Sequence, residues 1–241
     1  MAYEIFNGDK LPYRGTERFR KLDNPIDSLR FEARYRHGIE PISPEEVALL
    51  PSLVVERGCE GAAHYIHGGY YVAERIKSVI ERLEPNVHQF YPADVSHSDG
   101  SRPDEAYYFL QVGQAFDAIL VEHSAVKWSV VKVESEITTL TALISATLPN
   151  DARKVIRMSR PAIGKGHLWR GFRICESKIF LSESLATALR EAGGDADSIV
   201  GYDYKCPELD LPWLPEENLP PPSGEWSSRV TGYYSIKSEL L

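Results

Sequence analysis

The chain has 241 residues, of which 43% are hydrophobic and 26% charged, and its formal net charge is −8. A chain of this length and composition is expected to fold as one large or two small soluble domains, with a core that needs no disulfides or metal ions. No run of about 18 apolar residues occurs, which excludes a transmembrane helix. The acidic balance argues against nucleic-acid binding and suits either simple solubility or a basic protein partner.

The cysteines and the N-terminus indicate the cellular compartment. Cys59, Cys175 and Cys206 are odd in number, widely spaced and form no Cys-x-x-Cys pair. This pattern favours free thiols in a reducing compartment over a disulfide framework or a zinc ribbon. The first ten residues contain no basic segment followed by an apolar one, so no secretory signal is predicted. We therefore expect a cytoplasmic protein.

Residues 1–60 are predicted to add short strands and one helix to the same domain as the residues that follow. Tyr3–Phe6 reads as a strand, and Leu29–Arg36 alternates apolar and charged residues as a half-buried strand does. Ser43 precedes a proline and two acids, which predicts a capped helix that runs to about Leu50.

Residues 61–206 contain two segments that predict the same strand–helix–strand pattern. The first has a strand, a helix and a strand at Tyr70–Val72, Ala73–Glu84 and His88–Tyr91, and the second has them at Lys178–Leu181, Ser182–Ala192 and Ser198–Tyr204. Both helices carry apolar residues at the i, i+3, i+4, i+7 spacing. The segments are either two related modules or two generic amphipathic helices that look alike.

Further strands complete the predicted fold. They lie at Ala106–Val112, Val126–Val133 and Leu168–Ile174, whereas Ser135–Leu148 is ambiguous. The predicted fold class is α+β, with a mixed or mostly antiparallel sheet, two similar strand–helix–strand modules, and helices packed on the sheet. Residues 207–241 contain six prolines, all between positions 207 and 222. They are expected to form a proline-rich tail that packs on the body.

Motifs for chemistry are missing from the sequence. His64 and His67 have a spacing that can bind metal on a helix, but glycines surround them and no further ligand follows at a recognisable distance. There is no nucleophile elbow, no phosphate-binding loop and no Cys nucleophile motif. We therefore expect no enzyme activity, no cofactor and no metal. The alternative is an enzyme with an unrecognised site around His64, His67 and His88.

Two acid-bearing segments are candidates for binding a protein partner. One is the loop Pro92–Glu105 and the other is the proline-rich tail. The candidate residues are Asp94, Asp99, Asp104 and Glu105 in the loop, and Asp210, Trp213, Glu216 and Glu217 in the tail. A tryptophan flanked by acids can anchor a basic partner. The alternative is a tail that packs on its own domain with Trp213 buried.

Three segments resemble, in the same order, a family of bacterial immunity proteins from polymorphic toxin systems. It is family eleven of the usual series, a former domain of unknown function with a myxobacterial prototype. The segments are Tyr70–Pro92, the stretch Tyr107–Ser124 with its tyrosines, aspartate and serine, and Leu168–Leu189. The sequence departs from the family where Gly193–Asp197 precedes the last strand, because the family usually has a glycine followed directly by an aromatic strand.

The resemblance implies a cytoplasmic protein that binds and neutralises a cognate toxin, often a nuclease, and does no chemistry itself. The implied partner is a protein toxin, expected to be basic, with no nucleic-acid or membrane partner. The resemblance carries over no toxin-binding residue, since its motifs read as scaffold. An adaptor protein of a secretion system is the other alternative, and the sequence leaves the oligomeric state open.

Overall fold

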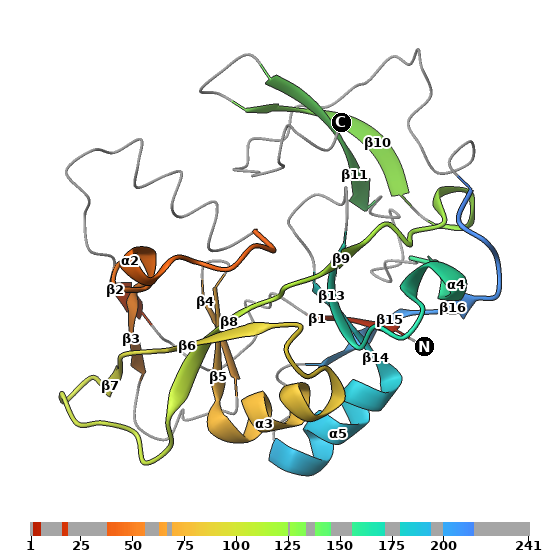
Figure 1. The fold of residues 1–241 in the computed structure, drawn as a ribbon. Helices are drawn as coiled ribbons and strands as arrows, with labels where there is room; N and C mark the ends of the chain where they lie inside the picture. Colours follow the sequence, from red (N-terminus) through yellow and green to blue (C-terminus); the bar gives the residue numbers. More distant parts are fainter. Residues whose placement is uncertain are drawn as a thin grey trace. The chain divides into compact units, whose positions relative to one another are not determined.

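A computed structural model of the chain describes residues 2–5, 16–18, 38–55, 63–66, 69–124, 126–133, 138–145, 156–171, 179–193 and 200–214 (Figure 1). These residues form both helices and strands, in sheets that are mostly antiparallel or mixed, which confirms the α+β fold class. Among the described helices, none combines the length and apolar character that crossing a bilayer requires.

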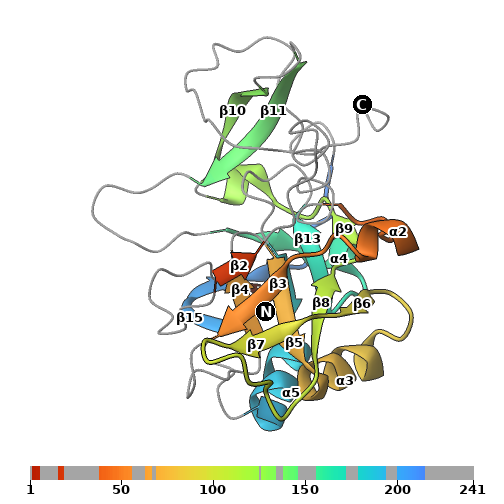
Figure 2. The same ribbon diagram turned by 90° about the vertical axis from the view of Figure 1, so that its left-hand side faces the viewer.

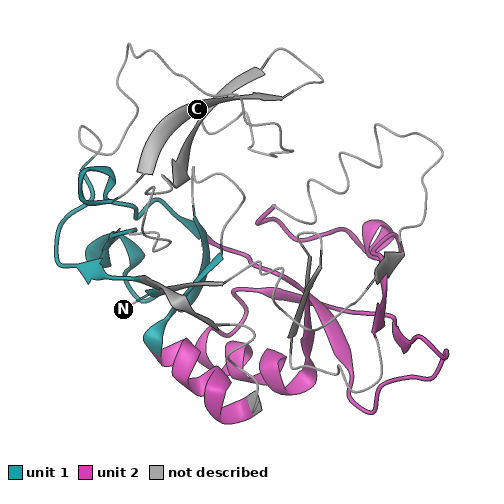
Figure 3. Ribbon diagram, turned by 180° about the vertical axis from the view of Figure 1, so that it is seen from behind, with its two compact units in different colours: residues 1–5, 115–183, 201–236 teal, residues 6–114, 184–200, 237–241 magenta. Residues whose placement is uncertain are grey.

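The chain divides into two compact units (Figure 3). Unit 1 comprises Met1–Ile5, Ala115–Glu183 and Gly201–Ile236, and unit 2 comprises Phe6–Gln114, Ser184–Val200 and Lys237–Leu241. Each unit therefore draws on segments that are far apart in the sequence. The predicted division at residues 60 and 206 follows the order of the chain and stays a prediction.

Unit 2 contains two sheets and three helices in the described residues. Its elements are β2 (Thr16–Arg18), α2 (Pro44–Val47), β3 (Ser52–Val55), β4 (Ala63–Ile66), β5 (Gly69–Ala73), α3 (Glu74–Leu83), β6 (Gln89–Pro92), β7 (Val95–His97), β8 (Tyr107–Gln111) and nearly all of α5 (Glu183–Gly193). One sheet has the order β4-β5-β8-β6 and is antiparallel throughout. The other has the order β2-β3-β7, with β3 and β7 parallel.

The two faces of the four-stranded sheet are covered differently. Alternate residues of its strands, Tyr71 and Ala73 on β5 and Tyr107 and Phe109 on β8, belong to a buried cluster with Leu53 and other residues of the second sheet. Helix α3 contacts β5 and β8 and buries the apolar stripe Ile76, Val79 and Ile80. The apolar residues thus recur every second position in the strands and about every 3.6 positions in the helix, and in each case they lie on the buried side of the element.

Unit 1 is built around a five-stranded sheet with the order β15-β1-β14-β13-β9 (Figure 1). Its elements are β1 (Ala2–Ile5), β9 (Ala115–Phe116), the 3-10 helix η1 (Val121–His123), β10 (Val126–Val133), β11 (Thr138–Ser145), β12 (Met158–Ser159), α4 (Arg160–Ile163), β13 (Leu168–Gly171), β14 (Ile179–Ser182), β15 (Val200–Cys206) and β16 (Glu208–Leu209). Two further sheets, β10-β11 and β12-β16, have two strands each.

An aromatic stack fills the core of unit 1. The ring of Trp169 lies 6.1 Å from that of Phe180 and 5.9 Å from that of Phe116, measured between centroids. Trp169 and Phe180 are fully buried, and Ile156 and Met158 pack in the same cluster. Residues from β13, β14, β9 and β12 therefore meet in one core.

The two strand–helix–strand modules repeat one strand order. In the first, β4 and β5 form a hairpin, α3 follows, and β8 lies between β5 and β6. In the second, β13 and β14 pair, α5 follows, and β1 lies between β14 and β15. The registers also correspond, because Val72 of β5 lies opposite Tyr108 and Leu181 of β14 lies opposite Tyr3. The third strand comes from a different part of the chain in each case.

Several predicted elements differ in extent from the structure. The helix after Ser43 ends at Val47, although the predicted capping is present, since Ser43 and Glu46 exchange side chain–backbone hydrogen bonds. The ambiguous segment after position 134 contains the strand β11. The predicted strand Leu29–Arg36 lies outside the described residues.

Candidate partner-binding surfaces

The acidic loop between β6 and β8 contains a short strand that the sequence did not predict. Strand β7 pairs in parallel with β3, and its residues Val95 and His97 are buried. Three residues are too few to produce a recognisable alternation, so the segment read as a loop. The candidate acids lie on both sides of this strand, with Asp94 before it and the other three after it.

Three of the loop acids lie on the surface of unit 2. The side chain of Asp94 is 74% exposed, and one of its oxygens lies 3.8 Å from a guanidinium nitrogen of Arg102. Asp104 is exposed. Asp99 shapes its own turn, because its Oδ1 accepts hydrogen bonds from the backbone N–H and the hydroxyl of Ser101 at 2.9 and 2.6 Å. Asp94 and Asp104 thus present charge outward, while Asp99 acts within the loop.

Glu105 has a structural role at the start of α3. Its carboxylate accepts hydrogen bonds from the backbone N–H of Arg75, at 3.1 Å, and from the guanidinium of Arg75, at 2.6 Å. The helix has no side-chain cap of its own, since the N-cap position is Ala73. Glu105 therefore supplies from a distant loop the acceptor and negative charge that a helix N-terminus favours. Its carboxylate is thus engaged within unit 2.

A small depression adjoins Asp94. It has a volume of about 180 Å³ and is lined by the end of α2 and by residues around β3 and β6, including Leu50, Ala93 and Phe109. Asp94 is the one ionisable residue of its lining. The depression therefore offers a single carboxylate beside apolar groups and contains no acid–base pair.

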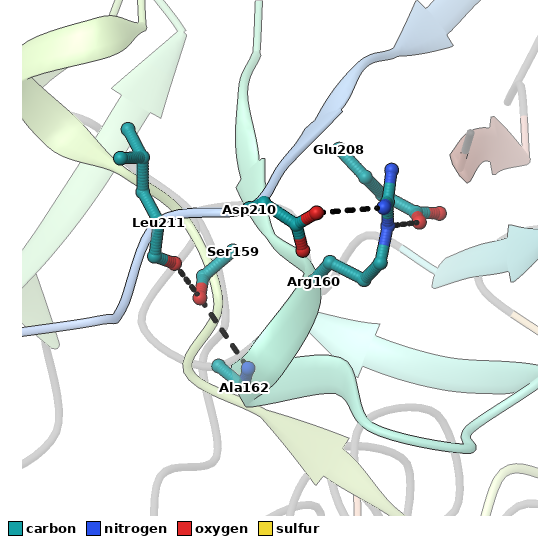
Figure 4. Close-up of polar contacts among 6 residues, drawn as sticks. All are labelled: Ser159, Arg160, Ala162, Glu208, Asp210 and Leu211. Atoms are coloured by element: carbon teal, nitrogen blue, oxygen red, sulfur yellow. Dashed lines mark hydrogen bonds and ion pairs between the residues drawn. The ribbon is translucent and has the colours of Figure 1, made fainter.

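In unit 1 the start of the tail is pinned to the segment around α4 (Figure 4). Strand β16 pairs in parallel with β12. The hydroxyl of Ser159 donates to the carbonyl oxygen of Leu211 at 2.6 Å and accepts from the backbone N–H of Ala162, which caps α4. The guanidinium of Arg160 lies 3.4 Å from a carboxylate oxygen of Glu208 and 3.2 Å from one of Asp210. We call residues 207–214 the strap.

The strap combines exposed charge with exposed apolar surface. The side chain of Asp210 is 79% exposed, and Leu211, 38% exposed, is one of two large hydrophobic residues that are exposed in the described part of the chain. Trp213 is half-buried, and its indole nitrogen is buried with no hydrogen-bond partner among the described residues. Its position lies between the two expectations of an exposed anchor and a buried side chain. Glu216 and Glu217 lie outside the described residues.

The histidine cluster of the enzyme alternative is not assembled in the described residues. Only the backbone of His64 is placed, in β4 opposite Tyr71, and His67 lies outside the described residues. No group of three His, Cys, Asp or Glu side chains that could hold a metal ion occurs in the part of the chain that the structure describes.

His88 instead belongs to a buried hydrogen-bond network. Its Nε2 lies 2.7 Å from Glu84 Oε2, and its Nδ1 accepts from the backbone N–H of Gly113 at 3.2 Å. The second oxygen of Glu84 accepts from the amide of Gln114 at 2.7 Å. Since Nδ1 is an acceptor, Nε2 carries the proton that is shared with Glu84. Both ring nitrogens are thus engaged in holding the end of α3 to the end of β8, and the sequence contained no motif that indicated this.

The structure thus defines an acidic α+β protein with two repeated sheet modules and with acids on the surface of each unit. Comparison with protein families finds a match to the Immunity protein family (Imm11) over residues 15–205. The match covers well over half of the chain, from β2 almost to the end of β15, and the chain therefore belongs to this family. The family resemblance inferred from the sequence is confirmed. No curated protein matches the chain.

Proposed function

We propose that the chain is an immunity protein that binds one cognate bacterial toxin stoichiometrically and inhibits it without any chemistry of its own. The observation that carries this proposal is the family match over residues 15–205, which supports a protein toxin as the partner. The proposed setting is the cytoplasm of a bacterium that uses a polymorphic toxin in competition, where the protein protects its own producer. A nuclease is the proposed toxin.

The charge of the chain supports a basic toxin. A net charge of −8 attracts a basic protein at long range and raises its rate of association. The same charge repels nucleic acid, so the protein is proposed to act on the toxin and to leave the nucleic-acid substrate unbound.

The proposed toxin-binding residues are the exposed acids of the strap and of the loop. The strap contains the exposed Asp210 and Leu211 and the half-buried Trp213, and tryptophan is among the residues that most often anchor an interface. Asp94 and Asp104 supply charge on unit 2. Glu216 and Glu217 extend the proposed acidic surface along the tail.

The decisive experiment isolates the partner from the native bacterium. The tagged chain is purified from its producer, and the proteins that co-purify are identified by mass spectrometry. The expected result is one protein at near-equal stoichiometry that kills cells when expressed alone and is harmless when expressed with this chain. A partner that is not toxic, such as a component of a secretion system, would contradict the proposal and favour the adaptor alternative.

The binding surface is tested by charge reversal. A variant with Asp210→Lys, Glu216→Lys and Glu217→Lys should associate with the toxin more slowly, and the difference should shrink as salt is added. The matched control reverses the same number of exposed acids away from the tail and the loop, as Glu45→Lys, Glu122→Lys and Glu191→Lys together. Unchanged association of the triple variant at low salt would remove the tail from the interface.

A further inference from the structure

Strands β10 and β11 form a sheet of only two strands. Their antiparallel register runs without interruption through eight residue pairs, from Val126 opposite Ser145 to Val133 opposite Thr138. No third strand joins this sheet among the described residues, and Figures 1 and 2 draw the two strands as a ribbon of their own. We call the pair the β10–β11 ribbon.

Within the part of the chain that the structure describes, the outer rows of backbone groups of β10 and β11 have no partner strand. In an antiparallel pair each strand directs alternate N–H and C=O groups to its neighbour and the others to its outer edge. A two-stranded hairpin is marginally stable in water, and three strands or packing against other elements are normally needed. Eight-residue strands are also longer than the usual five or six. The ribbon is therefore a long template on which a further strand can pair.

The two outer edges differ in their protection. Strand β10 contains two lysines, Lys127 and Lys132, and lysine on an edge strand opposes unwanted pairing. Strand β11, Thr-Thr-Leu-Thr-Ala-Leu-Ile-Ser, contains no charged residue, no proline and no glycine. Its three threonines and its isoleucine are β-branched and favour the extended backbone. The residues of β11 itself thus include none of the charges or prolines that usually keep an edge strand from pairing.

We propose that the outer edge of β11 is the docking site for a β-strand of the toxin, which adds to the ribbon as a third strand. The proposal rests on the proposed immunity function. Added strands obtain affinity from backbone hydrogen bonds, with selectivity from side chains at alternate positions. The strand of a basic protein approaches this acidic chain favourably, whereas two copies of the chain, each with a charge of −8, repel one another.

Hydrogen exchange of the backbone amides tests the edge directly. In the free chain at low concentration, alternate amides of Thr138–Ser145 should exchange fast, since they point to the outer edge. In the complex with the toxin found by the co-purification, the same amides should become protected. Protection already present in the dilute free monomer would mean that another part of this chain covers the edge. Protection that appears only as the free chain is concentrated would mean that a second copy covers it. Either result would overturn the proposal.

A matched set of proline variants tests the contribution to affinity. Leu140 lies opposite Val131 and Thr139 lies opposite Lys132, so the two members of each pair direct their N–H groups alike, both inward or both outward. The exchange data show which pair points outward. Proline at the outward position of β11 removes a donor from the docking edge and leaves the pairing with β10 intact. Proline at the opposite residue of β10 is the control.

The β11 variant should bind the toxin up to about 10-fold more weakly, the effect of one lost backbone hydrogen bond. The β10 variant should bind as the unchanged chain does. Equal binding by both variants would overturn the proposal that β11 is the docking edge, but it would leave the proposed immunity function standing. Failure of the unchanged chain to bind any toxin would instead overturn the proposed function.

Discussion

The modules around α3 and around α5 share a strand order but differ in how they are held together. In the first, polar side chains fix both ends of the helix, with Glu105 at the start of α3 and Glu84 just after its end. In the second, the described contacts of the strands are mostly apolar and centre on the rings of Trp169 and Phe180. The same strand order is thus compatible with a helix whose ends are held by polar side chains, which we call the polar frame, and with an aromatic core.

The modules also differ in where their helices belong. Helix α3 lies in the same unit as the strands before and after it, whereas α5 belongs almost wholly to unit 2 although β14 and most of β15 belong to unit 1. Figures 1 and 2 both place α3 beside α5. The two modules therefore share a strand order, although only α3 belongs to the same compact unit as the strands before and after it. The comparison leads to four predictions, which remove either a polar contact or a ring.

The largest effect is expected from Trp169→Ala in the second module. The side chain is fully buried, stacks with one ring and contacts a second at a tilt, so its loss creates a large cavity. We expect the free energy of unfolding to fall by ~3–5 kcal/mol. Urea unfolding followed by circular dichroism measures it. A loss below ~1 kcal/mol would show that the aromatic stack is not what holds this module.

A smaller loss is expected from Glu84→Ala in the first module. The substitution removes the acceptor of the buried His88 and of the half-buried Gln114, which costs about 2–3 kcal/mol. Glu81→Ala is the control, because it removes an exposed ion pair with Lys77 on the same helix and should cost below ~1 kcal/mol. Similar losses for the two variants in urea unfolding would contradict a polar frame.

Removal of the distant cap of α3 should cost less again. Glu105→Ala takes away the acceptor for the backbone N–H of Arg75, and we expect a loss of about 1 kcal/mol, as for other helix caps. Hydrogen exchange should speed up most in the first turn of α3. Asp104→Ala, the neighbouring exposed acid, is the control and should leave that turn unchanged.

The smallest effect concerns Tyr108 on β8. A hydrogen bond from Tyr108, aided by the charge of Lys77, lowers the pKa of Glu74 below its ordinary value of 4.5. Because the folded pKa is depressed, the stabilisation is present above the unfolded pKa and is lost as the pH falls through the folded one. Tyr108→Phe should raise the pKa of Glu74, which NMR titration measures. The stability change should be about 0.5 kcal/mol or less, since the carboxylate is 43% exposed. An unchanged pKa would contradict the hydrogen bond as the cause.

Local sequence patterns correctly predicted those elements whose identifying residues are neighbours in the chain. The stripe of Ile76, Val79 and Ile80 is buried in α3 as its spacing indicated, and the Ser43 cap is present. Strand β10 has the predicted bounds. In contrast, β7 escaped prediction because its three residues are stabilised by pairing with β3, some forty positions earlier in the chain.

The candidate surface shows the same limit. The sequence identified acids, but their charge alone could not separate those that face solvent from those that hold the fold together. Glu105 and Asp99 act within unit 2 through hydrogen bonds, whereas Asp94 and Asp210 expose most of their carboxylates. Their roles depend on which donors the folded chain brings within about 3 Å, and spacing along the chain does not contain that information.

The sequence by itself determined the fold class, the two amphipathic helices and the membership of an immunity protein family, because periodicity and family patterns are properties of neighbouring residues. Only the tertiary structure decided that β1 lies between β14 and β15, that β8 lies between β5 and β6, and that Glu84 joins His88 to Gln114. Such pairings join segments that are distant in the chain, so they contribute to stability only after the chain between them has folded into a closed loop.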